Sequence, residues 1–362
     1  MEINLAVLGR QFELYQAEYE AAALRALRSG WYILGGELES FEREFAEYLG
    51  AKFCVGVNSG LDALTLTIRA LGIGAGAEVI VPANTYIATA LAVTANGAVP
   101  VFVEPDEFYN LDAEKISAAV TEKTRAIMAV HLYGQPANLE KICAVAEKFS
   151  LPIVEDCAQS HGAKFNGKMT GTFGVGCFSF YPTKNLGAFG DAGAVVTDNE
   201  SFAREIRTLR NYGSEVKYHN KIAGVNSRLD EIQAALLRVK LSHLDELNAE
   251  RKKIARRYLN EIKNSRIILP KILDGAEHVW HQFVVRTENR DAFQKYLAQK
   301  NIQTVIHYPI PPHLAECYAG LEFKRGAFPV AEKFSDEVLS LPIFNGMTAA
   351  EINYVVEVVN EF

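Results

Sequence analysis

Seven short apolar runs, separated by segments with helical periodicity, limit most strongly what this 362-residue chain can fold into. Most of the runs are continuously apolar, which is typical of strands that are buried on both faces. Such strands, alternating with helices, predict an α/β fold built on a mainly parallel sheet. The last two runs follow each other closely, with three glycines between them, and could pair as antiparallel neighbours. The runs occupy residues 53–57, 78–81, 99–103, 126–130, 153–155, 177–180 and 194–197.

The remaining segments carry apolar residues at the spacing of amphipathic helices. From about residue 199 to 263 the pattern is almost wholly helical, and residues 229–263 predict one long helix. We expect this helix to link a large α/β domain, residues 1–245, to a smaller α+β domain, residues 246–362. Helices are expected at 12–29, 37–49, 61–71, 86–96, 112–121 and 138–149, and the smaller domain should contain strands at 280–285 and 305–308 and helices at 291–300 and 348–361.

The composition argues against several classes of protein. With 37 Lys and Arg against 44 Asp and Glu, the formal net charge of −7 makes a nucleic acid or an anionic membrane an improbable partner. The five cysteines lie far apart without metal-ligand spacing, so neither a disulfide framework nor a metal site is predicted. The N-terminus lacks the basic and apolar regions of a signal peptide, and we expect a cytoplasmic protein.

An acidic residue and a lysine at the ends of successive runs form the strongest functional signal. Asp156 follows the run 153–155, and Lys184 follows the next run, in Ser179-Phe-Tyr-Pro-Thr-Lys184. The carboxyl ends of parallel strands meet at one edge of a sheet, where α/β proteins bind ligands. Pyridoxal phosphate requires a lysine that forms a Schiff base with its aldehyde and an acid that keeps its pyridine nitrogen protonated. The pair therefore predicts a pyridoxal phosphate site, whereas either residue alone would indicate only a solvated lysine or a helix cap.

Further polar residues follow the other predicted strands. Ser59 and Gly60 precede a helix, where free backbone N–H groups and the helix dipole could hold a phosphate, although such residues are also ordinary helix caps. Tyr86 could stack on a planar ring or simply pack at a helix start. Gln159 lies one turn after the acid and could reach the same ring, and the hydroxyl of Ser179 could add to the phosphate site.

A series of motifs runs nearly from end to end of the chain, namely Gly30-Trp-Tyr-Ile-Leu-Gly35, Phe41-Glu-Arg-Glu-Phe-Ala46, Val57-Asn-Ser-Gly60, Thr85-Tyr-Ile-Ala-Thr89, Val130-His-Leu-Tyr-Gly134, Glu155-Asp-Cys-Ala-Gln-Ser-His-Gly-Ala163, Phe178-Ser-Phe-Tyr-Pro-Thr-Lys-Asn-Leu-Gly187 and Gly190-Asp-Ala-Gly193. These motifs resemble those of the DegT/DnrJ/EryC1/StrS nucleotide-sugar aminotransferases. The resemblance implies the aspartate-aminotransferase-like fold of fold-type I. Such a fold has a large domain with a seven-stranded, mostly parallel sheet and a smaller C-terminal α+β domain.

The resemblance also implies roles for individual residues. Lys184 would bind the cofactor covalently and shuttle protons, and Asp156 would pair with the pyridine nitrogen. Gln159 would hydrogen-bond the ring hydroxyl, and Tyr86 would stack on the ring. One departure is Leu61, which stands where many relatives have threonine and removes a possible phosphate ligand. The phosphate would be held by Ser59, Gly60, Ser179 and, from the second subunit of a homodimer, Asn226.

The activity implied is transfer of an amino group from L-glutamate to a nucleotide-linked keto-sugar. The motifs 58–64 and 307–313 favour C-3 of a dTDP-linked 3-keto-6-deoxyhexose. The alternatives are amination at C-4 of a 4-keto sugar, a sugar dehydratase with histidine in place of Lys184, and a non-catalytic ligand-binding or regulatory protein of the same fold. The implied substrate contacts are Tyr181, His307, Tyr308 and, from the partner subunit, Lys217.

Overall fold

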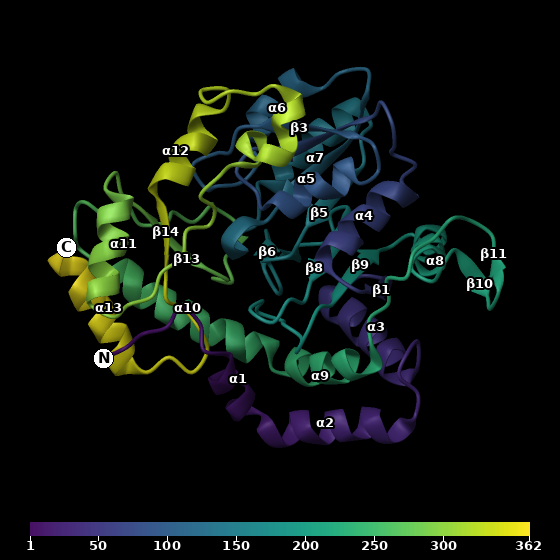
Figure 1. Ribbon diagram of the computed structural model, residues 1–362, viewed down its shortest axis with the longest axis horizontal. Coiled ribbons are helices and arrows are strands. Elements are labelled where there is room, and N and C mark those ends of the chain that lie inside the picture. Colours follow the sequence, from purple (N-terminus) through teal and green to yellow (C-terminus); the bar gives the residue numbers. More distant parts are fainter.

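The computed structural model describes residues 1–362, and all seven predicted strands form one sheet (Figure 1). In chain order they are β1 (Phe53–Val57), β2 (Glu78–Pro82), β3 (Val99–Val103), β4 (Thr124–Val130), β5 (Ile153–Asp156), β8 (Val175–Ser179) and β9 (Gly193–Thr197). Across the sheet their order is β1-β9-β8-β5-β4-β2-β3. β9 runs antiparallel to β1 and β8, and the other pairs are parallel. The mostly parallel sheet and its antiparallel pair are therefore confirmed.

Seven helices cover the two faces of this sheet. They are α3 (Gly36–Leu49), α4 (Gly60–Ala70), α5 (Ile87–Thr94), α6 (Ala113–Ala119), α7 (Leu139–Phe149), α8 (Glu200–Leu209) and α9 (Glu231–Ser242). Successive strand residues alternate between the faces: Val79 and Val81 pack with α4, α5 and α8, whereas Ile80 packs with α6 and α7. On the second face, α3 and α9 cover β8 and β9. None of the helices combines the length and the apolar character that crossing a membrane requires.

A separate core surrounds the far half of α10 (Leu244–Glu261), at the end of the molecule where both chain termini lie (Figure 1). Its buried side chains come from α10 and the C-terminal elements, with Ile3 joining them from the N-terminus. Those C-terminal elements are β13 (Phe283–Arg286), α11 (Arg290–Gln299), β14 (Val338–Leu341) and α13 (Ala349–Glu361). The division into two domains near residue 245 stays a prediction, which these separate cores support.

Two of the expected helices are each split in two. Instead of one helix over 12–29, the chain forms α1 (Leu8–Leu14) and α2 (Gln16–Ser29), and the predicted long helix breaks between α9 and α10. The breaks fall at Tyr15 and His243, whose rings stack with their centroids 3.7 Å apart. Neither break contains glycine or proline, so the local sequence gave no signal for it. The docking of the two helix pairs against each other decides where they end.

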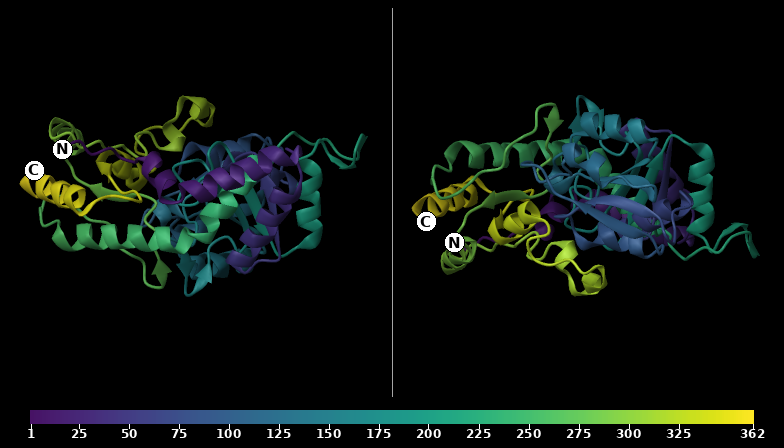
Figure 2. Two further views of the ribbon diagram at one scale, coloured as in Figure 1. Left: turned by 90° about the horizontal axis from the view of Figure 1, so that it is seen from below. Right: turned by 90° about the horizontal axis from the view of Figure 1, so that it is seen from above.

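The prediction of an almost wholly helical segment from about residue 199 to 263 is wrong between α8 and α9, whereas α8, α9 and α10 are helices as expected. The chain instead forms a hairpin of β10 (Ser214–Val216) and β11 (His219–Asn220), which projects from the body of the molecule (Figure 2). The backbones of Gly213 and Gly224 touch at the base of this hairpin, where a Cβ on Gly224 would lie 2.0 Å from the nitrogen of Gly213. This close approach requires glycine and excludes a continuous helix.

The expected strand at 305–308 is also wrong. Only Val305 forms a bridge, with Ser340 of β14, and His307 and Tyr308 lie in an irregular segment beyond it. Hydrogen bonds from Tyr133 and Gln159 of the large domain hold this segment in place.

Candidate active site

A cavity of about 620 Å³ opens at the carboxyl ends of β1, β4, β5 and β8. It is lined by all but two of the residues that the sequence analysis assigned to the site. The residues that it brings together are Ser59, Gly60, Tyr86, Asp156, Gln159, Ser179, Tyr181, Lys184, His307 and Tyr308. The strand order explains this convergence, because β5 and β8 are neighbours in the sheet and end side by side.

Asp156 ends β5 as a buried carboxylate that has no basic partner. Its side chain accepts hydrogen bonds from the hydroxyl of Thr89, at 2.8 Å, and from the backbone N–H of Ala158, at 3.2 Å. Burial raises the pKa of Asp156, and the two hydrogen bonds and the charge of Lys184 oppose that rise. A buried carboxylate without an ion pair is costly, so this position suits a ligand that brings a positively charged N–H group.

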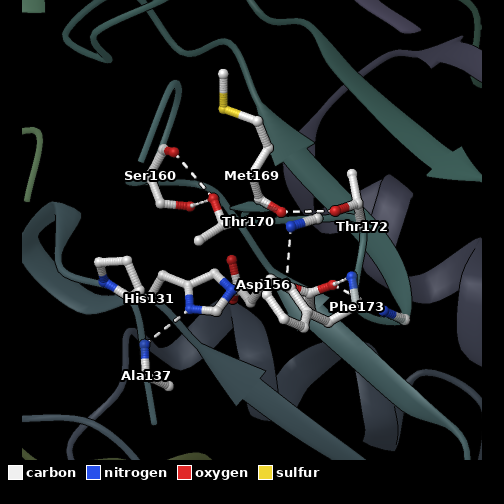
Figure 3. A network of polar contacts seen from close by, with 12 residues as sticks. His131, Ala137, Asp156, Ser160, Met169, Thr170, Thr172 and Phe173 are labelled. Carbon is white, nitrogen blue, oxygen red and sulfur yellow. Dashed lines mark hydrogen bonds and ion pairs between the residues drawn. The ribbon is translucent and has the colours of Figure 1, made fainter. Parts of the chain in front are cut away.

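The preceding acid, Glu155, faces the opposite side of the sheet, as strand alternation predicts. Its carboxylate accepts from the backbone N–H groups of Gly171, Phe173 and Gly174 at 2.7–2.8 Å and lies 3.1 Å from Nε2 of His131. Nδ1 of His131 accepts from the backbone N–H of Ala137 (Figure 3), so Nε2 carries the proton and donates to Glu155.

These bonds commit Glu155 to holding the connection before β8, which leaves Asp156 as the buried acid of the cavity. Together with Cys157, His131 and Glu155 form a group whose possible metal-ligand atoms lie within 4.8 Å of one another. Their hydrogen bonds already use both ring nitrogens of His131 and both oxygens of Glu155.

Lys184 lies half-buried in the cavity, in a turn that follows β8. The backbone N–H of Lys184 donates to the carbonyl of Tyr181 at 2.8 Å, which closes the turn. Desolvation lowers the pKa of the Lys184 amine to about 8, and the negative charge of Asp156 opposes this effect. About a tenth of the amine is therefore unprotonated at pH 7, far more than for a lysine of ordinary pKa, and the unprotonated form is the nucleophile and proton acceptor.

The N-terminus of α4 forms a small concave site in the same cavity. Ser59 caps the helix by accepting from the N–H of Asp62 at 3.1 Å. Gly60 allows the end of β8 to lie close to the start of α4, since a Cβ at Gly60 would lie 2.5 Å from Cβ of Ser179. Gly193 is equally restricted, with a Cβ there only 2.4 Å from the backbone of Ser59. The unpaired N–H groups of the first helical turn and the hydroxyl of Ser179 suit an anion such as a phosphate.

The opposite wall of the cavity joins the two domains. Gln159 accepts from the N–H of Tyr133 at 2.6 Å and donates to the hydroxyl of Tyr308 at 3.0 Å. Tyr133 in turn donates through its hydroxyl to the carbonyl of His307. The ring of Tyr308 lies 5.1 Å, centroid to centroid, from that of Tyr86. These contacts place the irregular segment at 307–308 beside the predicted cofactor residues.

Asn226 and Lys217 lie outside this cavity. Asn226 is exposed and forms a bridge with Asn211. Lys217 lies at the tip of the projecting hairpin, where its amine packs over the ring of Tyr218 at 5.1 Å (Figure 2). Neither residue approaches the site of its own chain, and both were expected to serve the site of a second subunit.

Sequence reasoning missed several residues of this site. Thr89 is the closest partner of Asp156, and its position one turn after Thr85 on a helix that begins at the cavity was a usable signal. His281 and Gln282 also line the cavity, but they come from a segment between α10 and β13 that shows no recognisable motif. Asp191 lines the cavity as well.

The residues present fit pyridoxal phosphate. Lys184 offers a half-buried amine of lowered pKa, and Asp156, only 6% exposed, is a carboxylate without a cationic partner. The N-terminus of α4, shaped by the close contact of Gly60 with Ser179, offers N–H groups to a phosphate. The three features line a single cavity large enough for a ligand of that size.

The chain matches the DegT/DnrJ/EryC1/StrS aminotransferase family over residues 14–360. It is 56% identical over 350 residues to the dTDP-3-amino-3,6-dideoxy-alpha-D-galactopyranose transaminase of Aneurinibacillus thermoaerophilus, covering 96% of both chains. The crystal structure of DesV from S. venezuelae superposes with a TM-score of 0.98 at 48% identity, covering 99% of this chain and 98% of that one. NtdA from Bacillus subtilis with bound cofactor PMP gives a TM-score of 0.91 at 30% identity, covering 98% and 83%.

Proposed function

The chain belongs to the DegT/DnrJ/EryC1/StrS aminotransferase family, and we propose that it transfers an amino group from L-glutamate to C-3 of a dTDP-linked 3-keto-6-deoxyhexose. It is a pyridoxal phosphate-dependent aminotransferase of fold-type I. The observation that carries the proposal is the meeting of Lys184 and Asp156 in one cavity at the ends of adjacent strands. The cytoplasmic location inferred from the sequence stays a prediction.

The proposed chemistry needs a base, an acid and an electron sink in one place. Pyridoxal phosphate, when bound, supplies the electron sink that stabilises negative charge on the reacting carbon. Lys184 would be its covalent anchor, and the Lys184 amine would take the proton from Cα of glutamate and later deliver one to C-3 of the sugar. The lowered pKa of Lys184, about 8, supports both tasks, since proton transfer is most efficient when the pKa lies near the working pH.

The other residues would bind the cofactor and orient its ring. Asp156 would hold a proton on the pyridine nitrogen, because an ion pair in a buried site favours the charged form of both partners. Ser59, Gly60 and Ser179 would bind the phosphate at the N-terminus of α4, and Tyr86 would cover one face of the ring. Gln159 has one N–H committed to Tyr308, so only its second amide hydrogen is available for the ring hydroxyl.

Two observations support C-3 as the aminated carbon and dTDP as the carrier. The A. thermoaerophilus relative, similar over nearly its whole length, is named for a dTDP-linked sugar with its amino group at C-3 and no hydroxyl at C-6. The segment at 307–308, which the sequence analysis assigned to the sugar, lies at the cavity and is held there by Tyr133 and Gln159. Tyr181, which is half exposed at the rim, is placed to contact the same substrate.

A panel of acceptors tests this assignment. We expect amino-sugar product, measured by mass spectrometry, when the enzyme is incubated with glutamate and a dTDP-linked 3-keto-6-deoxyhexose, and much less with the 4-keto isomer. Production from 4-keto sugars alone would overturn the C-3 assignment and leave the aminotransferase activity standing. An enzyme that released 2-oxoglutarate from glutamate yet aminated neither sugar would overturn the proposed acceptor class.

We further propose a homodimer with shared sites. Asn226 and Lys217 are exposed and do not line the cavity of their own chain, which suits residues that serve a partner's site. Large apolar side chains are also exposed just before α3 and near Asn226, where a second subunit could cover them. These side chains are Trp31, Tyr32, Tyr212, Ile222 and Val225.

Mixing two inactive variants should restore activity if the sites are shared. Asn226→Asp should repel the phosphate, and Lys184→Ala lacks the anchor, so each variant alone should be nearly inactive. After random re-association, mixed dimers contain one intact site, and we expect about a quarter of wild-type activity. Sedimentation of the unmixed proteins as dimers is the accompanying measurement. A monomeric active enzyme, or dimers without any restoration, would contradict a shared site.

A further inference from the structure

His281 contributes a hydrogen-bond acceptor that no protein group uses. It lines the active-site cavity, on the segment that leads from α10 into β13. The segment is tied to the large domain, because the N–H groups of Val279 and Gln282 donate to the carbonyls of Gly134 and Tyr133 at 3.0 and 3.2 Å. The side chain of His281 is therefore held in place on the cavity wall.

A chain of hydrogen bonds fixes the protonation of His281. Asn248 on α10 donates to the carbonyl of His161 at 2.9 Å, so its oxygen is the acceptor for the amide N–H of Asn185 at 2.8 Å. Asn185 also donates to the carbonyl of Val279 at 2.9 Å. The oxygen of Asn185 must then face Nδ1 of His281, 3.3 Å away, and Nδ1 is the donor.

This arrangement leaves Nε2 of His281 as an unprotonated acceptor. Nδ1 carries the ring hydrogen, and no protein group donates to Nε2. Burial lowers the pKa of His281 well below its ordinary value, and the positive charges of Lys184 and Arg251 lower it further, so the ring stays neutral.

His307, the other histidine at this wall, is also held neutral. Burial lowers the pKa of His307 to about 4, and its Nδ1 is paired with the hydroxyl of Ser340 at 2.7 Å.

Gln282, the next residue, adds no acceptor to the cavity, because its side-chain oxygen is sealed from solvent and has no hydrogen-bond partner in the protein. Nε2 of His281 is therefore the acceptor that a ligand in the cavity can reach. Buried polar atoms are almost always paired in folded proteins, so an unpaired acceptor at a cavity wall calls for a ligand that carries a hydrogen-bond donor.

We propose that Nε2 of His281 accepts a hydrogen bond from a hydroxyl group of the sugar acceptor and so helps to select it. The inference rests on the proposed function, which supplies the two substrates. Apart from its reacting amino group, glutamate carries only carboxylates, whose oxygens would be repelled by this lone pair. A hexose carries hydroxyl donors next to its keto carbon, and a site that pairs them rejects analogues that lack them.

Two substitutions of His281 distinguish the role of Nε2, the free acceptor, from that of Nδ1, which donates to Asn185. In His281→Asn, the amide N–H can replace Nδ1 as the donor to Asn185, while the acceptor at Nε2 is lost. In His281→Gln, the longer side chain can return a polar atom to the position of Nε2. A single neutral hydrogen bond is worth about 1 kcal/mol, so we expect His281→Asn to raise KM for the keto-sugar by about fivefold to tenfold.

Measuring the two half-reactions separately shows whether His281 acts on glutamate or on the sugar. Single-turnover release of 2-oxoglutarate from glutamate should stay within about twofold of wild type in His281→Asn, whereas formation of the amino-sugar should fall. Calorimetry with a dTDP-linked 6-deoxyhexose that lacks the keto group should show the same weakened binding to the variant without cofactor. His281→Gln should recover part of both losses.

Each other outcome would overturn the inference. Equal slowing of both half-reactions would assign His281 to proton transfer with Lys184, and unchanged sugar binding in His281→Asn would leave Nε2 of His281 without a ligand. A wild-type enzyme that aminates no keto-sugar refutes the proposed function itself. That result is recognised before any variant is compared, so the two failures are distinguishable.

Discussion

Lys184→Ala should abolish turnover, with a loss of at least about four orders of magnitude in kcat. The substitution removes the amine that would anchor the cofactor and the same amine that would carry the proton to and from the reacting carbon. No second lysine lines the cavity, so no neighbouring amine can replace it. Release of 2-oxoglutarate from glutamate, followed in a single turnover, measures the loss without requiring the sugar acceptor.

A surface lysine provides the matched control for this prediction. Lys141 lies on α7, where it pairs with Glu114 at 2.8 Å, and Lys141→Ala should keep wild-type turnover. Borohydride reduction of the cofactor-loaded enzyme, followed by peptide mapping, should label the peptide that contains Lys184. A label on another lysine, or measurable catalysis by Lys184→Ala without added amine, would contradict the assignment.

Asp156→Asn should lower kcat by about three orders of magnitude while leaving the fold intact. The asparagine keeps the size of the side chain: its oxygen can accept from the N–H of Ala158 while its N–H₂ group donates to the hydroxyl of Thr89. It lacks the charge that holds a proton on the pyridine nitrogen. The electron sink would weaken, and proton removal from Cα of glutamate would slow accordingly. Near-normal turnover by this variant would contradict the role proposed for Asp156.

Asp156→Asn should not lower the stability of the folded protein, although it lowers the activity. The pKa of Asp156 is raised in the folded protein, so the folded state binds this proton more tightly than the unfolded chain. Ionisation of Asp156 therefore costs stability as pH rises above the unfolded pKa, and stability is greatest below it. Without cofactor at neutral pH, Asp156→Asn should melt at the same temperature as wild type or higher.

The adjacent acid offers the contrasting variant. Glu155→Gln keeps one carbonyl oxygen but replaces the other with an N–H₂ group facing backbone N–H groups that need an acceptor. We expect this variant to lose about 1–3 kcal/mol of unfolding free energy, read as a lower melting temperature. The two neighbouring acids of β5 would thus have different roles: Asp156 affects the chemistry, and Glu155 affects the stability. A stable Glu155→Gln would contradict the structural role of Glu155.

Local sequence patterns were enough to predict the sheet and the central pair of the site. Runs such as 99–103 and 126–130 are apolar on both faces, and this pattern is typical of strands in a sheet that helices cover on both sides. Asp156 and Lys184 follow successive parallel strands of the α/β region, β5 and β8, which became neighbours in the sheet. Local periodicity and strand-end chemistry therefore predicted the convergence of these residues, and the structure placed both in one cavity.

Only the tertiary structure decided the features that depend on contacts between distant segments. The break at His243 follows from stacking on Tyr15, which lies far away in sequence. The wall formed by His281, Gln282 and the segment at 307–308 exists because Tyr133 and Gln159 hold it against the large domain. Such contacts leave no periodic signal, since each depends on the docking of one folded unit against another and not on the local pattern of apolar residues.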